Sequence, residues 1–283
     1  MKTLVWASVV PFGLYCAPGG VAAVEVKEDA SGRVILSNEA ISLAFNLKNG
    51  TYAITHKATG QVVIDEAGLS ADCWGNAADM HFKWIQEAVK DVFGEGRRLV
   101  LEMEHGGTRS VPVYLFSFTL YAHQGAIIMG FGLRNPLKNG VRLFKAVPLA
   151  HARLFSGKPL DVPQTLNGAA GADTPRVEAK SVRNCSNSLL LTGTLGGERR
   201  SIVWGGLAYK EFGKWVELKT STLEMWAEDP VGRLVDPGQT YFSEDTFYLD
   251  VTQQDPFVAL EQYGLAMRAA NQARPNVYDF PRL

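Results

Sequence analysis

The chain has 283 residues, enough for one large all-β domain or two small domains. Hydrophobic residues make up 46% of it, so a sizeable core can be buried. The 28 Lys and Arg residues are balanced by 29 Asp and Glu residues, and no run of basic residues gives a positive footprint. Phosphate backbones and anionic membranes are bound by clustered positive charge, so this balance argues against nucleic acid or a membrane surface as a partner.

Residues 1–23 have the pattern of an export signal peptide. Lys2 supplies a positive start, residues 4–15 form a short apolar stretch, and residues 21–23 (Val-Ala-Ala) are small ones before a cleavage point. The apolar stretch is shorter than the roughly 20 residues that a membrane-spanning helix needs. The sequence therefore predicts an exported protein, periplasmic or secreted, that leaves the membrane after cleavage near Ala23. An uncleaved anchor or a lipid on Cys16 is the alternative.

The dominant period after the signal segment is two. Apolar and polar residues alternate over residues 41–47, the pattern of a half-buried strand. Asn49 and Gly50 follow and predict a type I′ turn, in which both central residues take positive φ. Further strands at residues 51–55 and 61–64 complete a predicted β-meander.

Strands of the same kind are predicted along the rest of the chain. They comprise residues 98–104, 111–122, 125–133, 142–150, 176–180, 188–192, 201–209, 214–219, 222–227 and 246–251. Many strands at regular spacing with turn residues between them indicate a sandwich or barrel rather than a parallel α/β sheet. Residues 157–174 are rich in Gly, Ala, Pro and Asp and are predicted to form a long loop.

One helix is predicted, at residues 255–272. Asp255 is a suitable N-cap, and Pro256 stands at the first helical position, where its missing N–H is not needed. Pro275 is expected to end the helix. The predicted apolar stripe of the helix consists of Phe257, Leu260, Leu265 and Met267.

A resemblance to a known family rests on three segments: residues 94–99 (GEGRRL), residues 166–171 (LNGAAG) with 187–192 (NSLLLT), and residues 255–264 (DPFVALEQYG) leading into 274–281 (RPNVYDFP). In these segments the chain resembles the N-terminal β-supersandwich of α-galactosidase-like glycoside hydrolases, of melibiase and raffinose-synthase type, in the clan of families 27, 31 and 36. The resemblance implies a large antiparallel, galactose-mutarotase-like β-sandwich at residues 24–254. Residues 255–283 would then be a linker helix and the start of a catalytic (β/α)₈ barrel.

By this resemblance the chain is the non-catalytic N-terminal domain of an exported glycosidase. It would support the barrel, shape the rim of a pocket for galactoside-type carbohydrate, and could take part in a homo-oligomer. The family's two catalytic aspartates lie on barrel strands, and a barrel needs about 250 residues. None follows Leu283, so we expect no catalytic residue in this chain and no cofactor or metal. A stand-alone carbohydrate-binding or structural β-sandwich is the alternative.

Residues 72–81 mix an aromatic ring with carboxylates, an amide and an imidazole in a stretch without a strand pattern. Sugars stack on aromatic rings and form hydrogen bonds with such polar groups. We therefore single out Asp72, Trp74, Asn76, Asp79 and His81 as candidate sugar contacts. A connecting loop in which Trp74 fills a gap is the plainer interpretation. A metal site at Asp72, Asp79 and His81 matches no standard ligand spacing.

Three further tryptophans, Trp204, Trp215 and Trp226, lie in predicted strands. Spaced aromatic rings can form a carbohydrate-binding platform, but aromatic residues in strands more often belong to the core. We expect these three in the core.

Two cysteines, Cys73 and Cys185, remain once the signal segment is removed. In an exported protein they could form a disulfide that closes a long loop, or stay as two buried thiols. Both arrangements are compatible with the sequence, because it does not give the distance between their Cα atoms.

Overall fold

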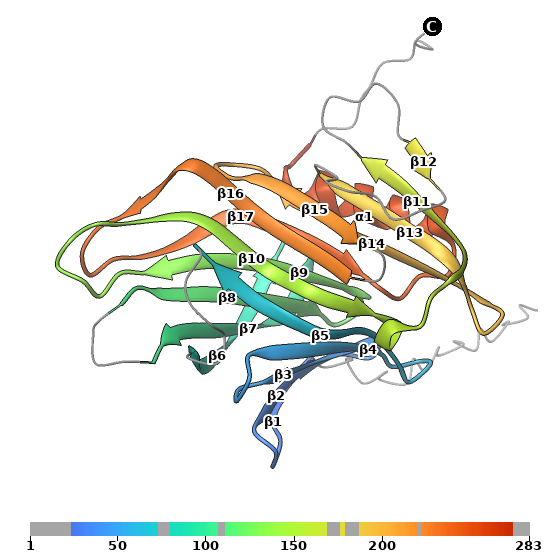
Figure 1. The fold of residues 1–283 in the computed structure, drawn as a ribbon, viewed down its shortest axis with the longest axis horizontal. Helices are drawn as coiled ribbons and strands as arrows, with labels where there is room; N and C mark the ends of the chain where they lie inside the picture. The colour runs from blue at the N-terminus through green and yellow to red at the C-terminus, as the bar shows by residue number, and fades with distance from the viewer. Residues whose placement is uncertain are drawn as a thin grey trace, which may run out of the picture.

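The computed structural model describes residues 24–72, 80–106, 111–168, 176–178, 187–219 and 222–273. Over these residues the chain forms two antiparallel β-sheets that pack against each other, and one α-helix close to the C-terminal end (Figure 1). The predicted all-β sandwich with a C-terminal helix is confirmed. The signal segment, Cys73 and Cys185 lie outside the described residues.

One sheet has eight strands. Its first five strands follow one another in sequence, which confirms the predicted meander. The other three strands come later in the chain, and the final one across the sheet forms its edge. In order across the sheet, the strands are β1 (Glu25–Glu28), β2 (Arg33–Ser37), β3 (Ile41–Asn46), β4 (Thr51–His56), β5 (Gln61–Ala71), β10 (Val141–Leu154), β16 (Thr222–Val235) and β15 (Gly213–Lys219).

The second sheet has nine strands. A single turn of 3₁₀ helix (Phe155–Gly157) connects β10 of the first sheet to β11 of the second. The order across the sheet is β12 (Arg176–Glu178), β11 (Asp161–Gly168), β13 (Ser188–Leu195), β14 (Glu198–Ala208), β17 (Thr240–Asp250), β9 (Ala126–Arg134), β8 (Val113–Tyr121), β7 (Gly94–His105) and β6 (Met80–Asp91).

The hairpin between β3 and β4 is confirmed, but the predicted type I′ turn is wrong. Asn46 pairs with Thr51, so the loop has four residues. Of the two central residues that were expected at positive φ, only Gly50 has it (φ 70°). Side chains close the longer loop, because Asn46 Oδ1 accepts a hydrogen bond from the Lys48 N–H at 2.9 Å and Asn49 Oδ1 accepts one from the Thr51 N–H at 3.1 Å.

Four strands, β1, β2, β6 and β11, fall where no strand was predicted, and the last two bear on the candidate sites. β6 pairs with β7 along its whole length, and Met80, Phe82 and Trp84 alternate with exposed residues. β11 occupies part of the predicted loop, so the expectation of a loop over residues 157–174 is wrong for that part. Only Thr165 of β11 is buried, and hydrophobic alternation therefore gave no signal there.

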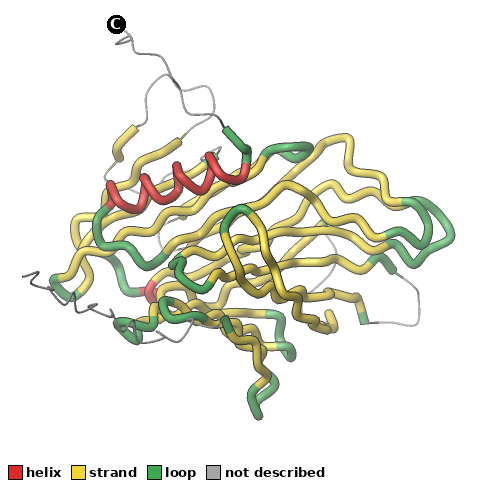
Figure 2. The backbone as a smooth tube through the Cα atoms, turned by 180° about the vertical axis from the view of Figure 1, so that it is seen from behind, coloured by secondary structure: helices red, strands yellow, loops and turns green. Residues whose placement is uncertain are grey.

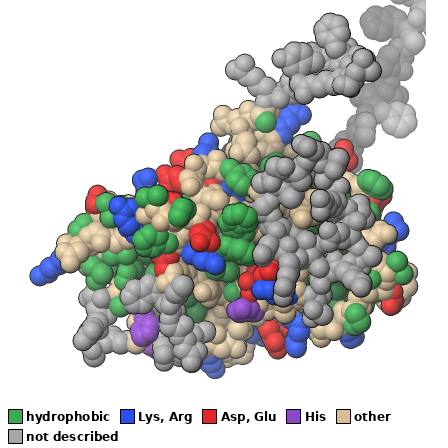
Figure 3. All heavy atoms as spheres, turned by 45° about the horizontal axis from the view of Figure 1, so that its top comes forward, with side chains coloured by type: hydrophobic (Ala, Val, Ile, Leu, Met, Phe, Trp, Pro, Cys, Tyr) green, Lys and Arg blue, Asp and Glu red, His purple; other side chains and the backbone are tan. Residues whose placement is uncertain are grey.

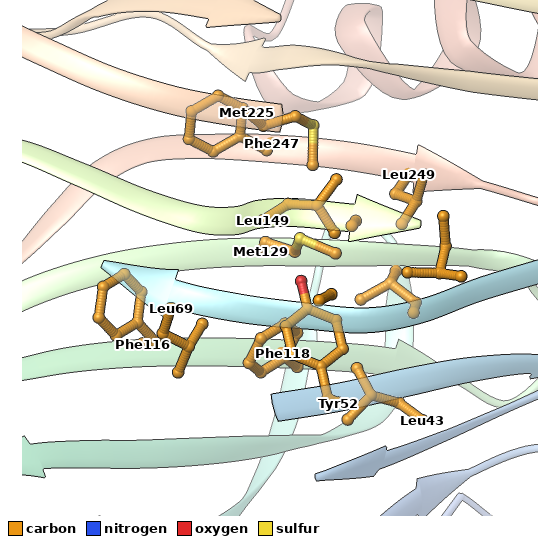
Figure 4. Close-up of a cluster of buried hydrophobic side chains, with 14 of the residues drawn as sticks. Leu43, Tyr52, Leu69, Phe116, Phe118, Met129, Leu149, Met225, Phe247 and Leu249 are labelled. Carbon is orange, nitrogen blue, oxygen red and sulfur yellow. The ribbon is translucent and has the colours of Figure 1, made fainter. Parts of the chain in front are cut away.

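A single large core fills the space between the two sheets. Leu43 and Tyr52 from the meander belong to this core together with Phe116 and Phe118 of β8, and the Tyr52 hydroxyl donates to the Pro148 carbonyl at 2.7 Å (Figure 4). Tyr52 and Phe118 pack edge to face, with ring centroids 5.1 Å apart. Strands far apart in sequence thus share one hydrophobic interior, which fixes the relative positions of the two outer sheet faces.

The helix α1 (Pro256–Ala270) lies across the outer face of the nine-stranded sheet, over β13 and β14 (Figure 2). As predicted, Asp255 caps it: its Oδ1 accepts from the Phe257 N–H at 2.8 Å. The predicted stripe is wrong in part. Ala259 and Tyr263 are buried against the sheet, whereas Phe257 and Leu265 are 79% and 50% exposed.

The helix ends at Ala270, before Pro275, which lies outside the described residues. The next residue, Asn271, uses its Nδ2 group to donate to the carbonyls of Leu207 and Met267, each at 2.8 Å. One side chain thus closes the C-terminus of the helix and ties it to the end of β14.

Candidate functional site

Asp72, the first candidate sugar contact, is held by the protein's own backbone. It follows β5 and has a positive φ of 40°. Its Oδ1 accepts hydrogen bonds from the N–H groups of Phe144 (2.9 Å) and Lys145 (2.6 Å), and the Tyr114 hydroxyl donates to its Oδ2 at 3.3 Å. Burial raises the pKa of this carboxyl despite those bonds. These contacts make Asp72 an anchor at one end of residues 73–79.

Asp72 and His81 are placed by strands of different sheets. His81 is exposed on β6 in the nine-stranded sheet, whereas Asp72 follows β5 in the other sheet. Trp74, Asn76 and Asp79, the other three candidates, lie outside the described residues. The nearby hollow, lined by Met80, His105, Val111, Pro112 and Tyr114, has a volume of about 10 Å³, room for a single water.

Metal-ligating side chains do not gather in the part of the chain that the structure describes. No group of three or more His, Cys, Asp or Glu there is arranged to hold an ion. Asp79, one of the three residues considered as a metal ligand, is not among those residues.

A different surface, which the sequence analysis did not select, combines aromatic rings with carboxylates. Trp215 and Trp226 stand directly opposite each other on β15 and β16, with ring centroids 6.4 Å apart and planes at 22°. Trp215 is 38% exposed and Trp226 is half-buried, so the expectation that both belong to the core is wrong. Trp204 is completely buried, so that expectation is confirmed for Trp204.

These two rings lie in an open groove of about 570 Å³ on the outer face of the eight-stranded sheet. Its size falls in the range of small-molecule sites, about 300–1,000 Å³. Figure 3 shows hydrophobic, acidic and basic side chains mixed across the view rather than one patch of a single charge. We call this the tryptophan groove. It is lined by Glu211, Gly213, Trp215, Trp226, Glu228, Asp229 and Pro230.

The alternation of the two strands contained the signal for this groove. Val216 and Leu218 point into the core, so their neighbour Trp215 must point out. Likewise Met225 and Ala227 are buried, which turns Trp226 outward. Aromatic content alone favoured the core, whereas the period of two, read from the neighbouring residues, places both rings on the surface.

The turn that leads into the groove is fixed by a buried carboxylate. Asp245 accepts hydrogen bonds from the backbone N–H groups of Lys210 (2.7 Å), Glu211 (2.8 Å) and Phe212 (3.0 Å), and from the Lys214 ammonium. Although burial by itself would raise the pKa of Asp245, these donors hold it below its ordinary value. Glu211 is therefore presented to the groove on a backbone with little freedom to move.

A second hollow, of about 410 Å³, lies beside α1, where His123, Gln253, Gln262 and Leu265 contribute to its wall. The carboxylate in this wall, Asp250, is already used locally. Its Oδ1 accepts from the N–H and hydroxyl of Thr252, at 2.8 and 2.7 Å. This network braces the connection from β17 to the helix and provides no free catalytic carboxylate.

The sequence matches no known protein family, and no curated protein matches it. Within the described residues, no helix is both long and apolar enough to cross a membrane.

Solved structures do share the fold. The GH36 α-galactosidase AgaB from Geobacillus stearothermophilus matches with a TM-score of 0.56 and 12% identity, over 85% of this chain and 42% of its own. The α-galactosidase from Lactobacillus brevis matches with a TM-score of 0.51 and 13% identity, over the same shares. The A355E variant of G. stearothermophilus AgaA matches at 0.53 and 11%, over 82% and 42%.

Identities this low establish a common fold and nothing finer. The matched region is less than half the length of each α-galactosidase and most of the length of this chain. This chain therefore has the fold of one part of those larger proteins.

Proposed function

We propose that the chain is the N-terminal, non-catalytic sandwich domain of an exported glycoside hydrolase of α-galactosidase type. One observation carries the proposal: the fold match covers 85% of this chain but only 42% of AgaB. Such coverage is expected when a single domain is compared with a larger enzyme that contains the same domain. Glycoside cleavage needs two carboxylates held across the sugar, a separation of about 5 Å in retaining enzymes. In the proposed enzyme these belong to a barrel that follows the sandwich.

The exposed side of α1 supports this arrangement. Phe257 and Leu265 leave much of their side chains exposed, and Val258 is 39% exposed. A domain that follows the helix would cover these side chains and bury apolar area. Hydrogen exchange over residues 256–270 tests the contact: slower exchange is expected when the downstream sequence is present, and equal exchange in both proteins contradicts it.

The catalytic part of the proposal is tested by activity. We expect the 283-residue protein to release no galactose from a chromogenic α-galactoside, and a polypeptide extended by its natural downstream sequence to do so. The choice of substrate follows related proteins, since AgaA variants were solved with 1-deoxygalactonojirimycin and with raffinose. Hydrolysis by the 283-residue protein that is lost on replacing one of its own aspartates would overturn the proposal.

Residues 72–81 are proposed to shape the rim of the substrate pocket. Because the Asp72 carboxylate already accepts three hydrogen bonds, its role here is to position the segment, while Trp74, Asn76, Asp79 and His81 supply the contacts with sugar. In the extended enzyme, Trp74→Ala and His81→Ala should raise KM with little change in kcat, as loss of uniform binding does. Unchanged KM in both variants removes the segment from the site.

Export is a separate part of the proposal and rests on residues 1–23. A protein secreted from its native host should begin at Val24, which N-terminal sequencing or the intact mass measures directly. Recovery with residues 1–23 attached contradicts cleavage.

A self-sufficient carbohydrate-binding module is the second candidate, and the tryptophan groove favours it because that groove is complete within this chain. A natural stop codon after Leu283, together with glycan binding by the protein, would support the module over the accessory domain.

A further inference from the structure

We propose that the tryptophan groove is a binding site for a neutral saccharide. This inference goes beyond the proposed function, because every residue that forms the groove belongs to this chain. Binding in the groove does not depend on the presence of a barrel.

The rings form a short stack on neighbouring strands. Lys145 on β10 places its ammonium 5.0 Å from the centroid of the Trp226 ring, and Trp215 on β15 flanks the same ring from the other neighbouring strand. Trp226 is thus covered by partners on both adjacent strands. Trp215 lies on the edge strand, and no described residue forms a second aromatic or cation contact with it. Its outer ring face is available to a ligand.

The space beside that ring is open because residue 213 has no side chain. A Cβ atom on Gly213 would lie 3.6 Å from Trp215 Nε1, directly in the groove. The φ of Gly213 is not in the left-handed region, so the backbone does not require glycine there. Among the described residues, none accepts a hydrogen bond from Trp215 Nε1, which leaves that donor for a ligand oxygen.

Acceptors line the rest of the groove. Glu211, Glu228 and Asp229 provide three carboxylates. Glu211 accepts hydrogen bonds from Arg233 and Tyr241. Glu228 accepts one from Trp226 Nε1, and Asp229 accepts one from the Val231 N–H. A carboxylate has about four lone-pair positions, so acceptor capacity remains on all three.

The charge distribution selects among ligand classes. An anionic ligand would be repelled by the three carboxylates, and the cation position over Trp226 is already taken by Lys145. A neutral polyhydroxyl ligand meets neither difficulty. Its hydroxyls can donate to the carboxylates while its C–H face lies on Trp215. A saccharide unit satisfies both requirements.

The groove is also preorganised. Asp245 fixes the backbone of residues 210–212, and Lys214, between Gly213 and Trp215, is locked to the same carboxylate. Preorganised sites lose less conformational entropy on binding.

The test is affinity electrophoresis of the 283-residue protein in native gels that contain galactomannan, β-glucan or xylan, with titration calorimetry against raffinose. At least one glycan should retard the wild-type protein. Trp215→Ala should bind about tenfold more weakly, the loss of one aromatic contact, and Trp215→Phe should retain most of the affinity. Gly213→Leu should block the groove with both rings intact.

Ile85→Ala is the matched control, since Ile85 is 49% exposed on the other sheet and its loss should leave binding unchanged. Circular dichroism of each variant checks folding. Wild-type protein that no glycan in the panel retards overturns the proposal, and so does equal binding by Trp215→Ala and wild type. A dimer that Trp215→Ala dissociates, without glycan binding, would overturn it in favour of self-association. None of these results depends on hydrolytic activity, so they are distinct from failure of the proposed enzyme function.

Discussion

Lys214 and Asp245 form a salt bridge in which both side chains are completely shielded from solvent. The ammonium also lies 4.0 Å from the centroid of the Tyr209 ring. A charge this deeply buried is tolerated only when it is paired and hydrogen-bonded, and Asp245 meets that condition with three backbone N–H donors as well as Lys214. The pair is therefore the most tightly constrained polar contact at the start of β15.

Removal of the carboxylate should be costly. In Asp245→Ala the Lys214 ammonium loses its charged partner and three N–H groups lose their acceptor, so the free energy of unfolding should fall by about 3–5 kcal/mol. Urea titration measures the change. Lys90→Ala is the control, because the Lys90–Glu95 pair has a similar N–O distance of 2.8 Å but is exposed, and it should leave the urea midpoint unchanged. Equal effects of both substitutions would contradict the assigned role.

This pair also shows what the sequence could predict and where it failed. Alternation of Val216 and Leu218 correctly places strand β15 and its buried face. The same alternation puts Lys214 on that face, and no local pattern reveals that its partner is Asp245, 31 residues away. Long-range polar partners are set by the packing of the sheets, so the strands were predictable and the buried ion pair was not.

The candidate site was harder to predict for a related reason. The composition of residues 72–81 suits sugar binding, yet the Asp72 carboxylate accepts hydrogen bonds from the backbone of Phe144 and Lys145. Residue types do not reveal which polar groups are already hydrogen-bonded within the folded protein. Trp215 and Trp226 become neighbours only through the pairing of β15 and β16.

A prediction about the sandwich concerns Gly50 and Gly60. Both have positive φ, 70° and 66°, so alanine at either site costs about 1–2 kcal/mol of backbone strain. At Gly60 a methyl group meets nothing, whereas at Gly50 it would overlap the ring of Phe82, which packs edge to face on Phe45. Gly50→Ala should therefore destabilise by about 1–3 kcal/mol more than Gly60→Ala, the usual cost of overpacking.

The excess should disappear when the clash is removed. In a Phe82→Leu background, the costs of Gly50→Ala and Gly60→Ala in thermal or urea unfolding should converge. An unchanged difference would assign the effect to the loop and not to Phe82.

One buried hydroxyl helps to attach α1 to the sheet. Tyr263 donates to the Gly206 carbonyl at 2.5 Å, and both groups are buried under the helix. Tyr263→Phe leaves that carbonyl without its donor and should lower the free energy of unfolding by about 1–3 kcal/mol, with faster hydrogen exchange over residues 256–270. Tyr241→Phe is the control, because its hydroxyl donates to the exposed Glu211 and water can replace it. Unaltered exchange in the helix would show that other contacts hold it.

Asp72 gives a prediction whose sign depends on pH. Burial raises the pKa of its carboxyl above 3.8 in the folded protein, so between 3.8 and the raised value the folded state binds more protons than the unfolded state. The contribution of this group to stability is fully present below pH 3.8 and is lost as pH rises through the folded pKa. At neutral pH the ionised carboxylate carries a net cost of burial.

Asp72→Asn should remove that cost and keep the anchor. The amide oxygen can still accept from the N–H groups of Phe144 and Lys145, and asparagine tolerates a φ of 40°. Asp72→Ala leaves the two N–H groups and the Tyr114 hydroxyl without this acceptor and should destabilise by about 1–3 kcal/mol. In urea titrations from pH 3 to 7, the stability of wild type relative to Asp72→Asn should fall as pH rises. A difference that stays flat or rises across this range means that the Asp72 pKa is not raised, and its carboxylate then stabilises the fold as an ion.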